Sequence, residues 1–220
     1  MRVFIPTCES AVCTVPEWHR ADLKGSEEII TSPEGWSPGA LNLAQGLASR
    51  LQSPLLHGEM SRLLIDLSMH PEDDERWSRF SKQLTPDQRQ RLDDRQKKQY
   101  LDCLIQRTED ALKRNDEVLH LSVDTRPSLQ DTWIVFSYDS RRSSEADWVK
   151  EWTASIRSAL PEAIIKEEGT PTRSLAGHLR NRYPTGFSSV RITANQASFL
   201  EGIPVKWLDL KKTLVATVPR

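Results

Sequence analysis

The sequence predicts an α/β fold in which a central sheet, mixed but mostly parallel, lies between two layers of helices. Short apolar runs of strand length alternate along the chain with segments in which apolar residues recur every three or four positions. This order is typical of a sheet whose strands are joined by helical crossovers. With 220 residues, of which 37% are hydrophobic, the chain can bury a substantial core, and we expect one domain over residues 1–220.

The first part of the chain predicts a strand, a helix and two further strand candidates. Residues 3–5 are an apolar run that ends at Pro6, which favours a short buried strand. Ser37 can cap a helix and Pro38 has the φ angle of a first helical residue, so a helix begins here and ends before Pro54. A loop that can include one turn of helix is predicted at residues 17–36, and strand candidates lie at residues 55–56 and, more strongly, at residues 63–65.

The middle of the chain predicts one long helix after a polar loop at residues 69–84. Thr85 to Gln88 form a capping box with proline at the first helical position, and the helix runs from residue 86 to about residue 114. Its first half is almost wholly polar, so we expect it to be solvated. The second half has an apolar face that we expect to pack on the sheet, formed by Leu101, Leu104, Ile105, Ala111 and Leu112.

The strand at residues 119–124 alternates strictly between apolar and polar side chains. Leu119, Leu121 and Val123 point to one face of the sheet. The opposite face receives His120, Ser122 and Asp124.

The last part of the chain again alternates strands with helices. Further strands are predicted at residues 133–138, 163–165 and 190–194. Ser143 or Ser144 caps a helix whose buried face comprises Trp148, Val149, Trp152, Ile156 and Leu160. Two more helices are predicted at residues 174–183 and 205–218, the latter packing through Leu208 and Val215.

Composition excludes several classes of partner. The net charge of -1 gives no long-range attraction to nucleic acid or to anionic membranes. No apolar run is long enough for a signal peptide or a membrane span. Three cysteines form a poor disulfide framework and suit a reducing compartment, so we expect a cytoplasmic protein. The sequence gives no indication of the oligomeric state.

Three segments follow predicted strands and are therefore candidates for the functional site. They are residues 7–13, 124–127 and 193–196. In open α/β sheets, ligands bind beyond the carboxyl ends of the strands, and the three segments are expected to meet there.

Six stretches, in order along nearly the whole chain, resemble the N-formylglutamate amidohydrolase family. They are residues 7–10, 35–40, 61–67, 120–125, 138–142 and 192–196, reading Thr-Cys-Glu-Ser, Gly-Trp-Ser-Pro-Gly-Ala, Ser-Arg-Leu-Leu-Ile-Asp-Leu, His-Leu-Ser-Val-Asp-Thr, Tyr-Asp-Ser-Arg-Arg and Ile-Thr-Ala-Asn-Gln. The resemblance implies a three-layer, phosphorylase/hydrolase-like α/β fold related to the zinc carboxypeptidases. It also implies metal-assisted cleavage of an acyl group from an N-acyl amino acid such as N-formylglutamate.

The sequence departs from this family at the positions that matter most for catalysis. The family's two histidines stand as Ser10 and Asp124 here, and its glutamate, the expected base, stands as Thr193. A zinc hydrolase needs about three protein ligands and a general base. Ser37 replaces an aspartate of the family, which keeps the capping ability and removes a charge. We therefore expect the ancestral activity to be lost or weakened, with Ser10, Asp124 and Thr193 as the family-equivalent positions.

Other residues near the predicted site have alternative interpretations. Glu9, Cys13 and Asp124 could form a remodelled zinc site, but we expect no bound metal, with Cys8 packed as a small apolar residue and Glu9 solvated or ion-paired. A cysteine nucleophile paired with His120 is the least favoured reading.

Four residues are candidates for binding a substrate carboxylate or amide: Arg62, Arg126, Arg142 and Asn195. Arg62 has an equally weighted structural interpretation, an ion pair with Asp66 or Asp139.

Three functions remain open. The first is a non-catalytic relative that binds a small N-acyl amino acid, another small anion or a partner protein. The second is a metal-dependent amidohydrolase with altered ligands. The third is an interaction module without a small-molecule site that uses the long polar helix at residues 86–114 as a docking surface.

Overall fold

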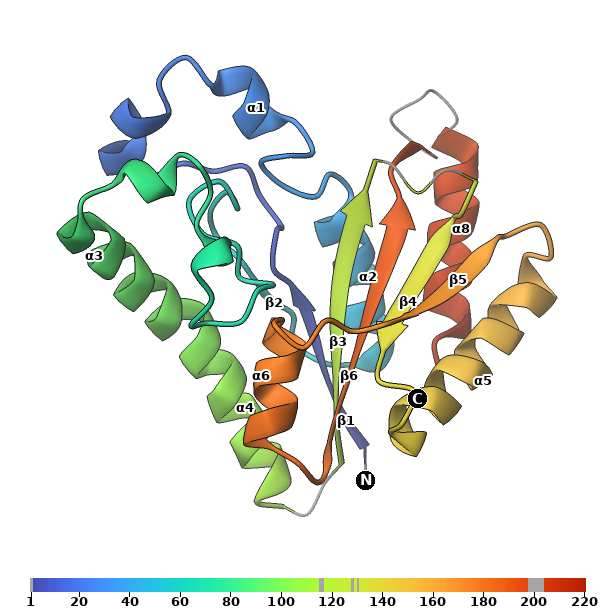
Figure 1. The fold of residues 1–220 in the computed structure, drawn as a ribbon. Helices are drawn as coiled ribbons and strands as arrows, with labels where there is room; N and C mark the ends of the chain where they lie inside the picture. Colours follow the sequence, from blue (N-terminus) through green and yellow to red (C-terminus); the bar gives the residue numbers. More distant parts are fainter. Residues whose placement is uncertain (1, 115–116, 128, 130, 198–203) are drawn as a thin grey trace.

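A six-stranded sheet forms the centre of the molecule, with the strand order β2-β1-β3-β6-β4-β5 (Figure 1). The structure is a computed structural model that describes residues 2–114, 117–127, 129, 131–197 and 204–220. The strands are β1 (Arg2–Cys8), β2 (Leu56–His57), β3 (Glu117–Arg126), β4 (Ile134–Tyr138), β5 (Ile165–Gly169) and β6 (Phe187–Asn195). β2, β1, β3 and β6 are parallel, β4 runs antiparallel to β6, and β5 is parallel to β4. The predicted α/β class with a mixed, mostly parallel sheet is thus confirmed.

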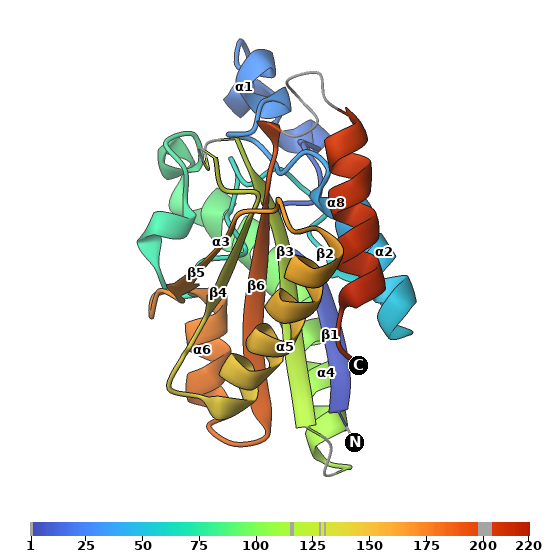
Figure 2. The ribbon, with the colours of Figure 1, turned by 90° about the vertical axis from the view of Figure 1, so that its right-hand side faces the viewer.

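Helices cover both faces of the sheet, which gives three layers (Figure 2). One face carries α2 (Ala40–Leu51), α5 (Ser143–Ala159) and α8 (Pro204–Thr217). The other face carries α4 (Asp102–Leu112) and α6 (Leu175–Arg182). The remaining helical segments are α1 (Glu27–Thr31), α3 (Pro86–Gln96), a π turn at Lys97–Leu101, and 3-10 turns at Glu17–His19, Ala21–Leu23, Asp74–Arg76 and Ser81–Gln83. None of the helices in the described ranges is long and apolar enough to cross a bilayer.

The alternating side chains of β3 divide the sheet into two chemically different faces. Leu119, Leu121 and Val123 are buried in the main core, which also contains the tryptophans of α5. His120 and Ser122 point to the face covered by α4 and α6, where they make polar contacts. The predicted orientation of this strand is confirmed.

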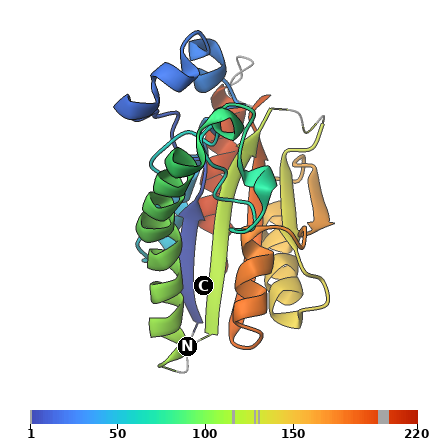
Figure 3. The ribbon, with the colours of Figure 1, turned by 60° about the vertical axis from the view of Figure 1, so that its left-hand side comes forward.

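The long helix forms as predicted, with an irregularity in its middle. Thr85 and Gln88 make both hydrogen bonds of the capping box at the start of α3. α3, the π turn and α4 follow one another along the side of the molecule (Figure 3). α3 is mostly exposed, whereas Leu104 and Ala111 of α4 are fully buried.

Two predictions in the first part of the chain are wrong. Residues 63–65 are not a strand. They lie in an irregular segment whose side chains are buried in a small separate core, and the sheet edge is occupied by β2. Ser37 does not cap a helix, because α2 begins at Ala40 after Gly39, whose φ of 84° is one that glycine adopts readily.

Other boundaries differ from the predicted ones. β1 continues through Pro6 to Cys8. Pro6 lies opposite Leu121 on β3, and its lack of a backbone N–H does not interrupt the pairing of the two strands. β5 occupies residues 165–169 instead of residues 163–165. α5 has no side-chain cap, and Ser144 instead contacts Ser188. In α8, Leu208 is 51% exposed, and the buried residues are Trp207, Leu210 and Leu214.

Candidate functional site

A row of polar side chains crosses the sheet at the carboxyl end of β1 and the middle of β3 and β6. Residues directly paired on neighbouring strands point to the same face. The strand register therefore aligns five residues on five strands, here called the polar row: Thr7, Ser122, Arg191, Ser137 and Glu168. This part of the sheet face consequently forms a polar floor, whereas the opposite face of β3 packs apolar side chains into the main core.

A cavity of about 390 Å³, here called the site cavity, lies above this floor. The floor contributes Ser122, Arg191, Ser137 and Glu168 from the polar row, together with Thr193. The opposite walls come from residues 66–75 and 171–176. Arg126 and Thr193, near the carboxyl ends of β3 and β6, also line the site cavity, and its volume is in the range of small-molecule sites.

The two wall segments are joined to each other by backbone and side-chain contacts. Met69 and Ser174 form an isolated β-bridge, and Leu175 N donates to Ser68 O over 2.9 Å. Arg173 forms an ion pair with Asp73 at 2.7 Å. These contacts hold the two walls as one unit over the floor.

Glu9 lies at the edge of the floor and accepts hydrogen bonds from three hydroxyl groups. Its Oε1 accepts from Thr7 at 2.6 Å and from Tyr100 at 2.8 Å, and its Oε2 accepts from Ser122 at 2.7 Å. Burial on its own would raise the pKa of Glu9, but the charge of Arg191 and the hydrogen bonds from Thr7 and Ser122 lower it below its ordinary value. Glu9 is therefore a buried, ionised carboxylate.

The direction of the hydrogen bonds fixes the state of His120. Thr7 Oγ1 donates to Glu9 and must accept from His120 Nε2, which lies 2.8 Å away. His120 Nδ1 then accepts from Ser189 Oγ at 2.9 Å. Burial lowers the pKa of His120 to about 4, against the opposing effect of Glu9, so the ring is neutral at pH 7.

Arg191 lies in the middle of the polar row and is the central positive charge of the site. Its Nε donates to Ser122 Oγ at 3.2 Å, and its other nitrogens have no hydrogen-bond partner among the described residues. Burial would lower the pKa of Arg191, but the neighbouring carboxylates of Glu9, Asp124 and Asp66 raise it. Arg191 therefore stays charged, and one side of its guanidinium group is available to a ligand in the site cavity.

Asp124 is surrounded by positive charges and a serine. Ser37 donates to its carboxylate and in turn accepts from Arg62. Arg126 Nε lies 3.5 Å from the other carboxylate oxygen. Burial opposes ionisation, but Arg191 and Arg62 keep the pKa of Asp124 below its ordinary value. Ser37 is thus a connecting residue between strand β3 and Arg62.

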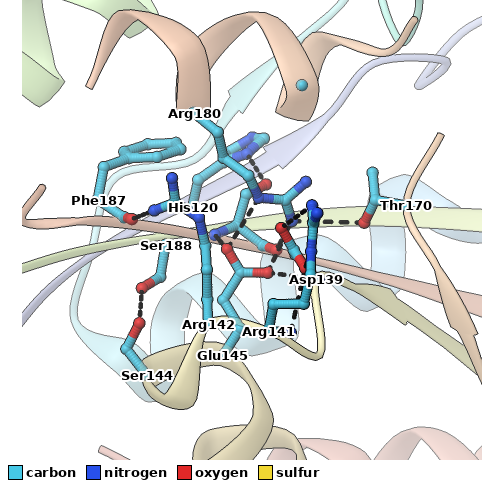
Figure 4. Close-up of polar contacts among 12 residues, drawn as sticks. His120, Asp139, Arg141, Arg142, Ser144, Glu145, Thr170, Arg180, Phe187 and Ser188 are labelled. Carbon is cyan, nitrogen blue, oxygen red and sulfur yellow. Dashed lines mark hydrogen bonds and ion pairs between the residues drawn. The ribbon is translucent and has the colours of Figure 1, made fainter. Parts of the chain in front are cut away.

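A buried ion pair supports the floor from the amino-terminal side (Figure 4). Glu145 and Arg180 form two parallel contacts of 2.9 and 2.7 Å. Glu145 also accepts from Ser189 N at 2.9 Å, and Arg180 donates to Ser189 O at 2.6 Å. Residue pairing between β4 and β6 ends at Arg191, so the ion pair satisfies the backbone of Ser189 where no strand does.

The residues at the family-equivalent positions lie at the expected strand ends but do not form a metal-binding group. Asp124 and Thr193 are directly paired on β3 and β6, and Thr193 lines the site cavity. Ser10 is buried, and its carbonyl accepts from Ser37 N at 2.9 Å. Among the described residues, no three His, Cys, Asp or Glu side chains are arranged to hold a metal ion.

The residues that the sequence offered as alternative zinc ligands are not gathered around the site cavity. Cys13 is half-buried and does not line the site cavity, and Glu9 is already held by hydroxyl groups. Cys8 packs in the main core, where burial and the charge of Glu9 raise the pKa of its thiol, so it is unsuited to act as a nucleophile. The donors of this site therefore do not fit a zinc ion.

The predicted substrate-binding residues are divided between different places. Arg126 lines the site cavity and has a side chain that is 55% exposed. Arg62 contacts Ser37 and lies 4.0 Å from Asp124, so its ionic partner is neither Asp66 nor Asp139.

The other two candidates do not line the site cavity. Arg142 donates to the carbonyls of Pro184 and Phe187, at the amino end of β6 (Figure 4). Asn195 donates to Thr132 O and accepts from Ala197 N, which holds the end of β6.

Sequence reasoning missed Arg191, Ser122 and Tyr100 as site residues. A signal for Arg191 was present, because a charged residue stands between Val190 and Ile192 on a strand whose apolar positions alternate. Such a position points to the opposite sheet face, and burial of a charge there requires partners. Tyr100 had no signal, since its contact with Glu9 depends on the π turn.

Comparisons with known proteins identify the fold. No protein-family model matches this chain, and no curated protein matches it. The structure of gene product Atu2144 from Agrobacterium tumefaciens is similar with a TM-score of 0.75 and 17% sequence identity, over 98% of this chain and 88% of that one. N-formylglutamate amidohydrolase from Ralstonia eutropha JMP134 is similar with a TM-score of 0.65 and 15% identity, over 96% of this chain and 92% of that one. The resemblance seen in the sequence is thus confirmed for the fold: this chain has the fold of an N-formylglutamate amidohydrolase.

Proposed function

We propose that this protein binds a small N-acyl amino acid in the site cavity and does not hydrolyse it by metal-assisted chemistry. The observation that carries the proposal is the position of Arg191, a charged guanidinium group among the carboxylates of the floor. A positive charge at this place stabilises Glu9 and Asp124 without a metal ion. Its unpaired nitrogens suit a ligand carboxylate, which guanidinium groups bind with charge-assisted hydrogen bonds.

The rest of the lining favours a ligand with both acceptor and donor groups. Arg126 adds a second positive charge at the mouth of the site cavity. Asp66 and Glu168 also line the site cavity and offer acceptors. An N-acyl amino acid has a carboxylate for the arginines and an amide N–H for a carboxylate acceptor, so it matches this mixture better than a simple anion.

The residues of the floor are poor candidates for a general base. The lone pairs of Glu9 are engaged by three hydroxyl groups, and its lowered pKa makes it a weak base. The ring of His120 has both nitrogens in hydrogen bonds and a pKa of about 4. Thr193, at the position of the family's base, is a hydroxyl that needs another base beside it. These properties support binding over turnover.

The test combines binding and turnover measurements on the whole protein. Isothermal titration with N-formyl-L-glutamate and N-acetyl-L-glutamate should show binding, and NMR should detect no released glutamate, with or without added zinc. Arg191→Met should weaken binding at least tenfold, because a charge-assisted contact contributes about 1.5–3 kcal/mol. Arg126→Met, at the exposed mouth, should weaken it less without affecting folding. Arg141→Met, whose side chain is 86% exposed and outside the site cavity, is the matched control.

A working amidohydrolase is the second candidate, favoured by the fold shared with the Ralstonia eutropha enzyme. Stoichiometric zinc in the purified protein, together with glutamate release that is lost in Asp124→Ala, would replace our proposal by this one. Absence of both binding and turnover would contradict both candidates.

A further inference from the structure

A second pocket of about 290 Å³, here called the side pocket, lies beside the site cavity between α4, α6 and residues 65–76. Asp66, Met69 and Leu175 line both spaces, so the two are neighbours with a common wall. Most of the lining surface of the side pocket is apolar and includes Leu67, Leu101 and Ile105. Charged and polar side chains also line it, namely Glu72, Arg76, Asp93, Gln96, Lys97, His178 and Arg182. The side pocket therefore suits an apolar group attached to a ligand in the site cavity.

One buried amide in the side pocket lacks a partner. Gln96, at the end of α3, is 2% exposed, lines the side pocket, and its Nε2 has no hydrogen-bond partner among the described residues. Arg76, on the same lining, has a buried Nε that is also unpaired within the described residues. Unpaired buried donors are unfavourable, and an acceptor oxygen on a bound group would satisfy them.

The π turn connects the side pocket to the polar floor. Tyr100 lies in this turn and lines the side pocket, while its hydroxyl donates to Glu9 at 2.8 Å. π turns in helices occur frequently at functional sites. The irregularity in the long helix thus places one side chain in contact with both spaces.

We propose that the side pocket holds the acyl chain of the ligand, which makes the ligand an N-acyl amino acid with an apolar chain of several carbons. This inference rests on the proposed function. The carboxylate lies on Arg191, the chain extends past Met69 and Leu175, and Gln96 donates to the acyl oxygen. A formyl group has no carbon beyond its carbonyl and leaves the side pocket empty, so N-formylglutamate is not the best ligand.

Chain length is the direct test. Isothermal titration with N-acetyl-, N-butanoyl- and N-hexanoyl-L-glutamate should show affinity that rises about fourfold for each added methylene until the side pocket is filled. A series in which affinity is flat or falls with chain length overturns the inference.

Two variants locate the effect. Ile105→Trp fills the side pocket and should abolish the gain with chain length, so that the three ligands bind this variant with similar affinity. Gln106→Trp, exposed on the same helix, is the control and should retain the gain. Gln96→Leu should weaken all three ligands about equally, and Gln90→Leu, exposed on α3, should not. A chain-length gain that persists in Ile105→Trp places the acyl chain elsewhere and overturns the inference.

A ligand without a carboxylate separates this inference from the proposed function. Hexanamide, measured by NMR titration, should bind wild-type protein and the Arg191→Met variant alike, and should fail to bind Ile105→Trp. Binding of hexanamide without binding of N-acetylglutamate would contradict the proposed function and leave the apolar site standing. Binding of N-acetylglutamate without any gain from chain length, and without binding of hexanamide, would contradict the inference about the side pocket and leave the proposed function standing.

Discussion

The hydrogen bonds around Glu9 form an ordered series, since a carboxylate accepts and cannot donate. Ser189 donates to His120, His120 donates to Thr7, and Thr7 donates to Glu9. Protonation of His120 would place a second donor opposite Ser189 and would add charge in a fully buried position. The stability of the folded chain should therefore depend on the neutral state of this ring.

The first prediction concerns acidification. The unfolded chain binds a proton at His120 below pH 6.5, whereas the folded chain does so only near its pKa of about 4, so stability is full above pH 6.5 and falls as the pH drops. Between pH 7 and pH 5 the free energy of unfolding should fall by about 2 kcal/mol from this group, measured by urea unfolding. In His120→Gln the free energy of unfolding should no longer show this fall with pH, whereas His57→Gln, on the sheet edge, should still show it. Equal slopes in wild type and His120→Gln would contradict the assignment.

The second prediction concerns the buried ion pair between Glu145 and Arg180, whose loss should lower the free energy of unfolding. Arg180→Met leaves the charge of Glu145 without its partner, and the free energy of unfolding should fall by about 3–5 kcal/mol. Arg141→Met removes an exposed arginine from the neighbouring Asp139 and should change it by no more than about 0.5 kcal/mol. The double variant Glu145→Gln/Arg180→Met should recover part of the loss. If Arg180→Met behaves like Arg141→Met in urea unfolding, the pair does not support the floor.

Helices and strands here are fixed by contacts as much as by local preference. α2 and α8 approach closely at Gly46, where an added Cβ would lie 2.9 Å from Val215 Cγ2. Residues 63–65 have the composition of a strand, but the position beside β1 is taken by β2, and their side chains pack in the small separate core instead. The π turn likewise serves a tertiary contact, that of Tyr100 with Glu9.

The third prediction tests the contact between α2 and α8. Helix propensity alone favours Gly46→Ala by about 1 kcal/mol. The crowding against Val215 should outweigh this, so that Gly46→Ala lowers the free energy of unfolding by about 1 kcal/mol. In a Val215→Ala background the methyl group has space, and Gly46→Ala should instead stabilise. Stabilisation in both backgrounds, measured by thermal unfolding, would mean that the two helices separate easily.

For the molecule as a whole, the sequence predicts the architecture better than the site. The alternation at residues 119–124 and the apolar periodicities are local, and they correctly predict an α/β fold with helices on both faces of the sheet. The pairing of strands in the sheet joins segments that are distant in the sequence, so a local pattern does not predict it. Arg142 precedes α5 and contacts the carbonyls of Pro184 and Phe187, so it does not line the site cavity although it was a candidate. Arg191 lines the site cavity because the register of β6 against β3 places it beside Ser122.

The two outer strands of the sheet have a consequence for assembly. On one side the sheet ends in β2, which has only two residues, and on the other in β5, whose sequence carries Lys166, Glu167 and Glu168. A very short strand offers few free backbone groups, and a charged one disfavours pairing with another chain. Neither border is a template on which a second molecule could extend the sheet. Any self-association of this protein should therefore proceed through its helices or loops, and the strands should remain six in number when copies meet.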